Sequence, residues 1–398
     1  MLQLQLQLQD LQDFPPVHDW SQLPADLLIR IFVDLDVLNL FSEARRLGHG
    51  PYCRNKSPCL LYSSNDNDPN TATLCRLTNK KLYRVMLPDP PPLRSCFVVG
   101  SCHGLLTIAD EQSKLHLVNP LSRAQIALPP PLTIKNVRGC YTTDEVLDSY
   151  HLLKLDLVNH ECDAQAEPDD LTLEQGCFYF YLRVAMSADP SSGRCIVDAR
   201  WTWIDVDQRC YSYNDFFYND SNGLFYVVRG NGEVHTIDLN GPSPVVKIIL
   251  RPMAPCIDNN KYIAQAPWGG MLQVWRYDDI VEEGEGRAVQ LEVYMVDLAE
   301  QKLVEIKNLQ EHVLFIGFNT PFFLLAEDYN MLTPDCIYLT NDYMDYIYSK
   351  KFGPRQVLVF NMKDGSLTDL FPDSDSDFWL SWPLPIWITP YYSQDNKG

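Results

Sequence analysis

Hydrophobic positions near the N-terminus follow a helical spacing. The apolar residues of one predicted helix recur three and four positions apart: Leu27, Leu28, Ile31 and Leu35. Pro24 suits the first turn of this helix, where its missing N–H removes no hydrogen bond. A second short apolar segment over 38–47 ends at Gly48, a residue typical of helix ends. Two short helices cannot bury so many large side chains alone, so residues 19–50 need a partner surface.

After residue 55 the pattern changes to short apolar or alternating runs separated by Gly, Pro, Asn and Asp, which is typical of strands and turns. Five of these runs end in an acidic or amide residue, then turn into a second run: Asn119, Asp189, Asp238, Asp297 and Asn361. The steps between these marker positions are about 50 to 70 residues. A repeat of this length, with strand pairs in each unit, indicates β-propeller blades, which stack because one blade cannot bury both faces alone.

We therefore expect a mainly β protein, a β-propeller of about six blades (five to seven) preceded by a small α-helical segment. Three further runs, 59–62, 73–77 and 81–85, predict an additional blade. The expected organisation is a low-complexity tail over 1–18, helices over 19–50 and a β-domain over 57–392. A large β-sandwich or two small β-domains remain the alternatives.

Charge and composition exclude several classes of function. The 398 residues include 52 acidic and 32 basic side chains, a formal net charge of -20. Such a field repels phosphate backbones and anionic lipid surfaces, so we expect neither nucleic-acid nor membrane binding. Basic partners would be attracted, although a strong negative charge also simply favours solubility. No signal peptide or long apolar run is present, and the 12 cysteines are scattered, so we expect reduced thiols and a cytoplasmic or nuclear location.

The sequence contains no catalytic constellation that stands out. None of the eight histidines forms a His-x-x-x-His pair or a zinc-spaced cluster. His116 and His235 occupy equivalent repeat positions, which favours packing or a hydrogen bond within a blade. Cys102 and His103 are adjacent, but neighbouring side chains of a strand point to opposite faces. We therefore expect no catalytic, cofactor or metal site.

Aromatic residues gather in two places, at Trp201 and Trp203 and again over 378–387. Such side chains could form binding hot spots on an exposed face of the propeller. Alternatively, they fill the core where the last blade closes the ring, which is the interpretation we favour.

The run Trp-Ser-x-Leu-Pro-x-Asp-Leu-Leu-x-x-Ile over 20–31 resembles the F-box, the segment that docks substrate receptors onto the Skp-type linker of SCF ubiquitin ligases. The resemblance implies a linker contact through Leu23, Pro24, Leu27, Leu28, Ile31, Leu35 and Leu40. Burying each large side chain is worth roughly 1.5–3 kcal/mol, so four or five would suffice after association costs. Over 44–54 the chain departs from the F-box pattern and lacks the usual Trp.

Motifs in the β-domain resemble the plant family catalogued as domain of unknown function 295. The matching runs include 57–62, 99–106, 115–120 and 217–226. Members of this family pair an F-box with a kelch-like domain, which implies a non-enzymatic substrate receptor without cofactors. Its partners would be the Skp-type linker, a cullin-based ligase and a target protein. The alternatives are a propeller scaffold whose degenerate F-box no longer docks, and a hydrolase that uses carboxylates around a central channel.

Overall fold

The computed structural model describes residues 6–7, 57–371 and 384–389. Within these ranges it leaves out 64–69, 89–94, 121–122, 155–165, 182, 185, 188–195, 198–212, 242, 255–259, 280–287 and 343–356. The predicted helices over 19–50 and the marker Asp189 therefore lie outside the described residues. Among the described residues, no helix combines the length and hydrophobicity needed to cross a bilayer.

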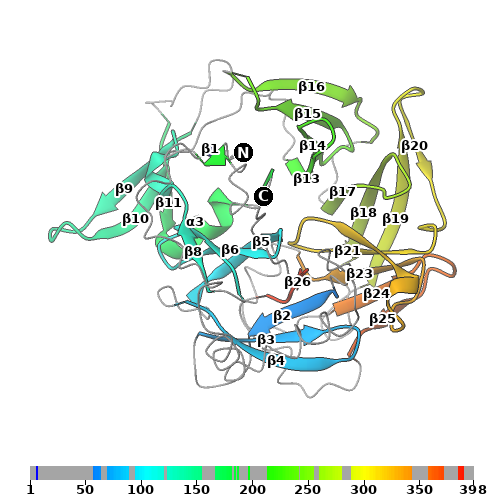
Figure 1. Ribbon diagram of the computed structural model, residues 1–398. Helices are drawn as coiled ribbons and strands as arrows, with labels where there is room; N and C mark the ends of the chain where they lie inside the picture. Colours follow the sequence, from blue (N-terminus) through cyan, green and yellow to red (C-terminus); the bar gives the residue numbers. More distant parts are fainter. Residues whose placement is uncertain are drawn as a thin grey trace, which may run out of the picture.

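Six sheets of three to five strands surround a common middle in the described part of the chain (Figure 1). The first sheet joins the two ends of the β-domain in the order β26-β2-β3-β4: Ile386–Ile388, Cys59–Ser63, Thr71–Arg76 and Lys81–Met86. Leu60 pairs with Trp387 in this sheet. The three runs expected to form an additional blade do so, and a late strand of the chain completes that blade.

Three further sheets are four-stranded and antiparallel, with strands in sequence order. The second sheet contains β5 (Phe97–Cys102), β6 (Leu105–Ala109), β7 (Leu115–Val118) and β8 (Gln125–Ala127). The fourth contains β13 (Tyr213–Asn219), β14 (Leu224–Arg229), β15 (Val234–Asp238) and β16 (Val245–Leu250). The fifth contains β17 (Asn260–Gln265), β18 (Met271–Asp279), β19 (Ala288–Asp297) and β20 (Lys302–Glu305). These sheets confirm the expected β-rich repeat.

The third and sixth sheets depart from this pattern. The third has the order β11-β10-β9, from Asp169–Thr172, Leu147–Leu152 and Val137–Tyr141. The sixth has the order β22-β21-β23-β24-β25, from Phe322–Leu325, His312–Ile316, Cys336–Thr340, Val357–Asn361 and Leu367–Asp369. Because β22 folds back on one side of β21, β23 pairs parallel to β21 on the other. A short pair, β1 (Leu6–Gln7) with β12 (Ile196–Val197), completes the strands.

In the part of the chain that the structure describes, one α-helix, α3 (Leu173–Phe180), follows β11. The pattern after residue 55, in which helical signals fade, did not predict this helix. Thr172 and Gln175 form a capping box, in which the Thr172 side chain accepts from the Gln175 N–H at 3.1 Å and the Gln175 side chain accepts from the Thr172 N–H at 2.8 Å. Short 3₁₀ segments occur at Pro131–Thr133 and Ala326–Asp328.

The marker residues of the repeat start turns at the ends of equivalent strands. Asp238 ends β15 and accepts a hydrogen bond from the Asn240 N–H at 2.9 Å. Asp297 ends β19 and accepts from the Glu300 N–H at 3.0 Å. Asn361 ends β24 and accepts from the Lys363 N–H at 2.9 Å. Side chains of Asp and Asn favour such turns because they replace a backbone acceptor, which explains why the repeat is visible in the sequence.

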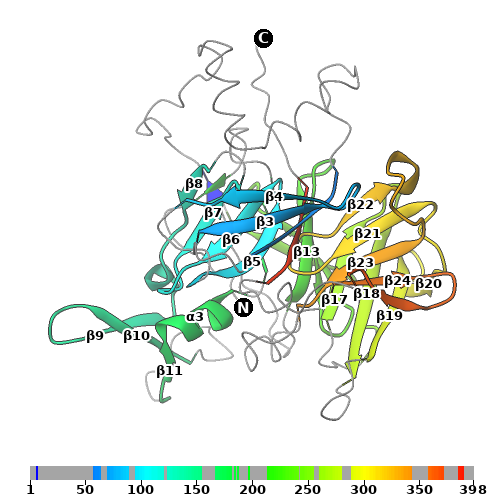
Figure 2. The same ribbon diagram turned by 90° about the horizontal axis from the view of Figure 1, so that it is seen from below.

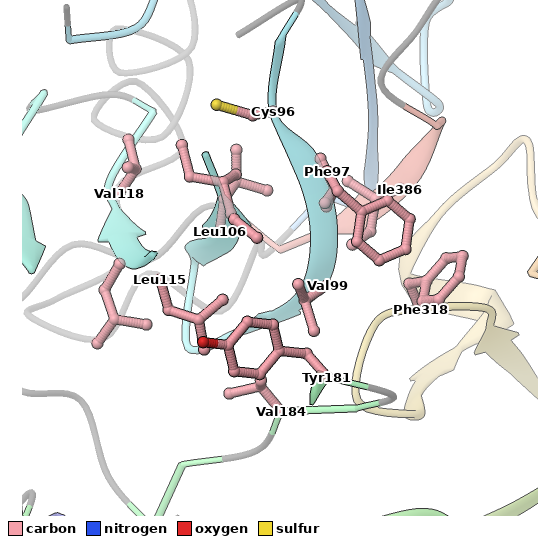
Figure 3. Close-up of a cluster of buried hydrophobic side chains, with 14 of the residues drawn as sticks. Cys96, Phe97, Val99, Leu106, Leu115, Val118, Tyr181, Val184, Phe318 and Ile386 are labelled. Carbon is pink, nitrogen blue, oxygen red and sulfur yellow. The ribbon is translucent and has the colours of Figure 1, made fainter. Parts of the chain in front are cut away.

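The largest buried cluster lies between the second sheet and its neighbours. Phe97 of β5 packs edge-on against Phe318, with ring centroids 5.7 Å apart, and Ile386 of β26 lies beside them (Figure 3). Ser101 of β5 donates to the Trp387 carbonyl at 2.5 Å, and its own carbonyl accepts from the Thr320 N–H at 3.0 Å. Strands from distant parts of the sequence are thus joined near the middle of the ring.

Candidate functional site

A buried polar cluster connects β17 and β18 of the fifth sheet with the segment that follows β23 of the sixth sheet, and β13 of the fourth sheet packs against β17. In Figure 1, β13 and β17 lie near the middle of the ring. Asp342, two residues after β23, is only 1% exposed. Its carboxylate accepts from Arg276 Nη1 at 3.0 Å, from the Tyr262 hydroxyl at 2.8 Å and from Arg183 Nη2 at 2.5 Å. One carboxylate therefore collects donors from β17, from β18 and from the segment after α3.

The two guanidinium groups extend this cluster to further elements. Arg276 donates to Asp278 at 3.0 Å and to the Thr340 carbonyl at 3.0 Å. Arg183 donates to the Gly317 carbonyl, and its guanidinium lies 5.1 Å from the centre of the Phe318 ring. Two cations thus face two carboxylates, and the contacts to Asp342 join separate parts of the chain, whereas Arg276 and Asp278 both lie on β18.

Burial and charge act in opposite directions on the two central carboxyl groups. Burial alone would raise the pKa of Asp342, but Arg183 and Arg276 outweigh it and hold that pKa below its usual range. Burial raises the pKa of Asp215 to about 7, although Arg183 and the Ile263 N–H, which donates to it at 3.0 Å, oppose the shift. Asp342 therefore stays ionised, whereas Asp215 titrates near neutral pH.

The hydrogen bonds of this cluster join strands. Because the carboxylates of Asp342 and Asp278 already accept from guanidinium groups, they are poor bases for an entering substrate. Among the described residues, no three His, Cys, Asp or Glu side chains are placed to hold a metal ion. We interpret the cluster as a structural one, whose hydrogen bonds and ion pairs hold the three sheets together.

Cys102 and His103 come together at the turn between β5 and β6. His103 and Gly104 both have positive φ, 50° and 74°, so the chain reverses directly after the strand. Burial alone would raise the pKa of the Cys102 thiol. Hydrogen bonds with the His103 side chain and with Thr320 outweigh this effect, so the pKa lies below its usual range. The expectation that these neighbouring side chains point apart is wrong, because His103 lies in the turn and no longer in the strand.

The two repeat histidines make hydrogen bonds within their blades, as expected. His116 Nε2 lies 3.1 Å from Asp110 Oδ2, and His116 Nδ1 lies 3.0 Å from Gln125 Nε2. His235 is 1% exposed, and its Nδ1 lies 2.8 Å from the hydroxyl of Tyr213.

Trp387 belongs to the core of the closing sheet. It has no exposed surface, and its ring packs edge-on against Phe315 with centroids 5.1 Å apart. For this residue, the core interpretation of the aromatic run 378–387 is confirmed. Trp201, Trp203 and the rest of that run up to 383 lie outside the described residues.

The predicted linker-binding residues also lie outside the described residues, so the structure does not test them. They are Leu23, Pro24, Leu27, Leu28, Ile31, Leu35 and Leu40.

Comparison with known proteins decides the family. Residues 74–361 match the model of the KIB1-4 β-propeller family. This chain belongs to the KIB1-4 β-propeller family. The match contains all strands from β4 to β24 and half of β3, so the ring of sheets is the propeller of this family. The family name differs from the label expected from the sequence, domain of unknown function 295, but the propeller architecture agrees.

Two curated relatives from Arabidopsis thaliana carry F-box names. One, named provisionally as an F-box protein, is 24% identical over 369 residues, which covers 84% of this chain and 92% of the relative. The other, F-box protein SKIP23, is 22% identical over 431 residues, which covers 96% of this chain and 98% of the relative. The similarity therefore extends over almost the full length of both proteins.

Solved structures give only a distant likeness. A Bacteroides fragilis protein named provisionally as a 6-phosphogluconolactonase is 10% identical, with 83% of this chain and 98% of that chain covered at a TM-score of 0.33. A protein of the same provisional name from Bacteroides uniformis is 8% identical, with 84% and 100% covered at a TM-score of 0.34. At these scores neither structure bears on the function.

Proposed function

We propose that this chain is the substrate-receptor subunit of an SCF-type ubiquitin ligase. The segment 19–50 forms an F-box that binds the Skp-type linker, and the propeller over 57–392 holds the target protein. Ubiquitin transfer takes place on other subunits of the ligase, so this chain supplies proximity and orientation. The residues that contact the linker are Leu23, Pro24, Leu27, Leu28, Ile31, Leu35 and Leu40.

The coverage of the SKIP23 match carries this proposal. An alignment over 96% of 398 residues leaves out only about 4%, which is roughly 16 residues. The F-box-like segment 19–50 is twice as long, so the similarity to a protein named as an F-box protein must extend into it. A likeness confined to the propeller would say nothing about segment 19–50, whereas the SKIP23 match extends into that segment and so supports the proposal.

The charge of the chain fits a protein target. With a net charge of -20, the surface repels nucleic acids and favours basic partners. Association with such a target is then electrostatically steered and weakens as salt rises.

A propeller scaffold with a degenerate F-box is the second candidate. The departure from the F-box pattern over 44–54, where the usual third-helix Trp is missing, favours it. In that case the propeller would bind its partner without recruiting a ligase.

Affinity capture with the proteasome blocked separates the two functions. A receptor is recovered together with the Skp-type linker and a cullin, and with a client that accumulates only under the block. A scaffold is recovered with its partner alone. Recovery of neither the linker nor the cullin, from cells in which both are abundant, would contradict the proposal.

A further inference from the structure

The hairpin of the third sheet projects outward from the ring. We call β9, β10 and their connecting turn, residues 137–152, the arm. Its base is buried, since Val137 is 1% exposed and Tyr150 is fully covered. Its outer end is exposed, with Tyr141 at 57% and Val146 at 59%. In Figures 1 and 2 the arm reaches beyond the neighbouring sheets.

Apolar side chains gather on one face of the arm around Gly139. A Cβ atom at Gly139 would lie 2.9 Å from Leu147, 3.0 Å from Tyr141 and 3.1 Å from Leu132, so these three side chains close over the glycine. Leu132 is 38% exposed. An exposed apolar patch on a projecting element is typical of an interaction surface.

The outer edge of β9 offers backbone groups to a further strand. The backbone carbonyl of Asn136 accepts from the Leu153 N–H at 2.8 Å, and the Thr142 N–H donates to the Val146 carbonyl at 2.9 Å. The backbone N–H and C=O groups of the even-numbered residues of β9 therefore face β10. By the alternation of an antiparallel pair, the N–H and C=O groups of Gly139 and Tyr141 face outward. Within the described residues β9 pairs only with β10, so this edge can receive a strand.

The edge is closed at the base of the arm. Arg138 Nη1 donates to the Val137 carbonyl and to the Lys135 carbonyl, each at 3.0 Å. The Arg138 guanidinium therefore occupies the Val137 carbonyl, which a longer added strand would need as a hydrogen-bond acceptor. The open part of the edge lies at the exposed end, beside Tyr141.

Charge determines the kind of strand that fits. The end of the arm, residues 141–148, carries three exposed carboxylates and no basic side chain: Asp144, Glu145 and Asp148. An acidic or neutral segment would gain nothing there, whereas lysine or arginine side chains flanking an apolar residue would meet both the carboxylates and the patch around Gly139.

We propose that the arm is a docking surface for an extended basic segment of a target protein, which adds as a strand beside β9. This proposal rests on the function proposed above, because it names the element and the partner chemistry for the target side of the receptor. The segment alternates apolar and basic residues, so that one face covers Tyr141 and Leu147 while the cations reach the carboxylates.

Binding of defined peptides to the full chain tests this proposal. The probes are a nine-residue peptide of alternating Lys and Ile, the same peptide with Glu in place of Lys, and a third with a central Pro in the basic peptide. Fluorescence anisotropy should show the basic peptide binding at least about tenfold more tightly than the other two, since proline removes a strand donor and glutamate is repelled. Equal affinity for the basic and acidic peptides would overturn the proposal.

Variants locate the binding. Replacing two exposed side chains of the patch, Tyr141→Ser with Leu132→Ser, should lower the affinity for the basic peptide by about tenfold or more. The matched control, Leu82→Ser with Ile248→Ser, removes side chains that are 58% and 54% exposed on other sheets and should change nothing. Hydrogen exchange adds a direct reading, since the amides of Gly139 and Tyr141 should slow when the peptide binds. An arm variant with unchanged affinity, or protection only elsewhere, would contradict the proposal.

Charge reversal completes the test. Asp144→Lys with Asp148→Lys should reverse the preference, so that the acidic peptide binds more tightly than the basic one; an unchanged preference would contradict the proposal. Binding of the Skp-type linker is measured on the same proteins. A native chain that binds the basic peptide without the linker contradicts only the ligase function, and one that binds the linker without peptide preference contradicts only the docking arm.

Discussion

The Asp342 carboxylate accepts a hydrogen bond of 3.0 Å from the Arg276 guanidinium, across two adjacent sheets of the ring. Both side chains are at most 3% exposed. Asp342→Ala should therefore lower the free energy of unfolding by roughly 3–5 kcal/mol, because it leaves the buried Arg183 without its hydrogen-bonded carboxylate and leaves Arg276 with Asp278 alone. Urea unfolding followed by circular dichroism measures this loss. The exposed Asp144→Ala should have little effect, and equal midpoints for the two variants would refute the role of Asp342.

Asp215 makes stability depend on pH. In the unfolded chain its pKa is about 3.9, whereas burial raises the folded pKa to about 7. Between these values the folded protein holds a proton that the unfolded chain has released, so stability falls as pH rises. Asp215→Asn, which keeps an oxygen for the Ile263 N–H, should remove this component. The variant should gain stability relative to the native chain from pH 5 to pH 8, and a difference that stays constant over this range would contradict the assignment.

Cys102 should react with iodoacetamide faster than Cys140, a thiol that is also partly exposed. The reason is the lowered pKa of Cys102, since the thiolate is the nucleophile. His103→Asn should slow the reaction while tolerating the positive φ of that position. Mass spectrometry of the labelled peptides near pH 7 compares the two sites. Equal labelling rates, or no effect of His103→Asn, would show that His103 does not activate the thiol.

Trp387 closes the ring by packing on Phe315 and pairing with Leu60 of β2. Removing this fully buried ring in Trp387→Ala should cost roughly 3–5 kcal/mol of stability. Trp387→Phe keeps an aromatic ring at the contact and should cost less, whereas the exposed Leu82→Ala should cost almost nothing. Thermal unfolding ranks the three variants, and a Trp387→Ala protein as stable as Leu82→Ala would contradict a closing role.

The repeat could be predicted because its signal is local. Asp238, Asp297 and Asn361 each start a turn through their own side chain, so an Asp or Asn recurs at the same place in these three sheets. The helix α3 also had a local signal, the capping box of Thr172 and Gln175, which sequence analysis missed beside the stronger strand pattern.

The central cluster and the arm could not be predicted. Arg183 and Asp342 are 159 residues apart in the sequence. From the sequence alone, each looks like an isolated charged residue, which is normally solvent-exposed. Only the folded ring brings them together, because Arg183 lies in the segment after α3 and Asp342 follows β23 of the sixth sheet. The exposure of the arm depends on how far β9 and β10 extend past the core. Alternating hydrophobicity along the two strands does not show at which residue the neighbouring sheets stop covering them.

Direct binding between the purified full chain and a purified Skp-type linker tests the central claim. Isothermal titration should show a one-to-one complex with the native chain, and Leu27→Asp should abolish it by placing a charge in the apolar contact. Leu82→Asp, an exposed position of the first sheet, should bind as the native chain does. If the native chain does not bind the linker, or if Leu27→Asp binds it equally well, this protein is not an SCF receptor.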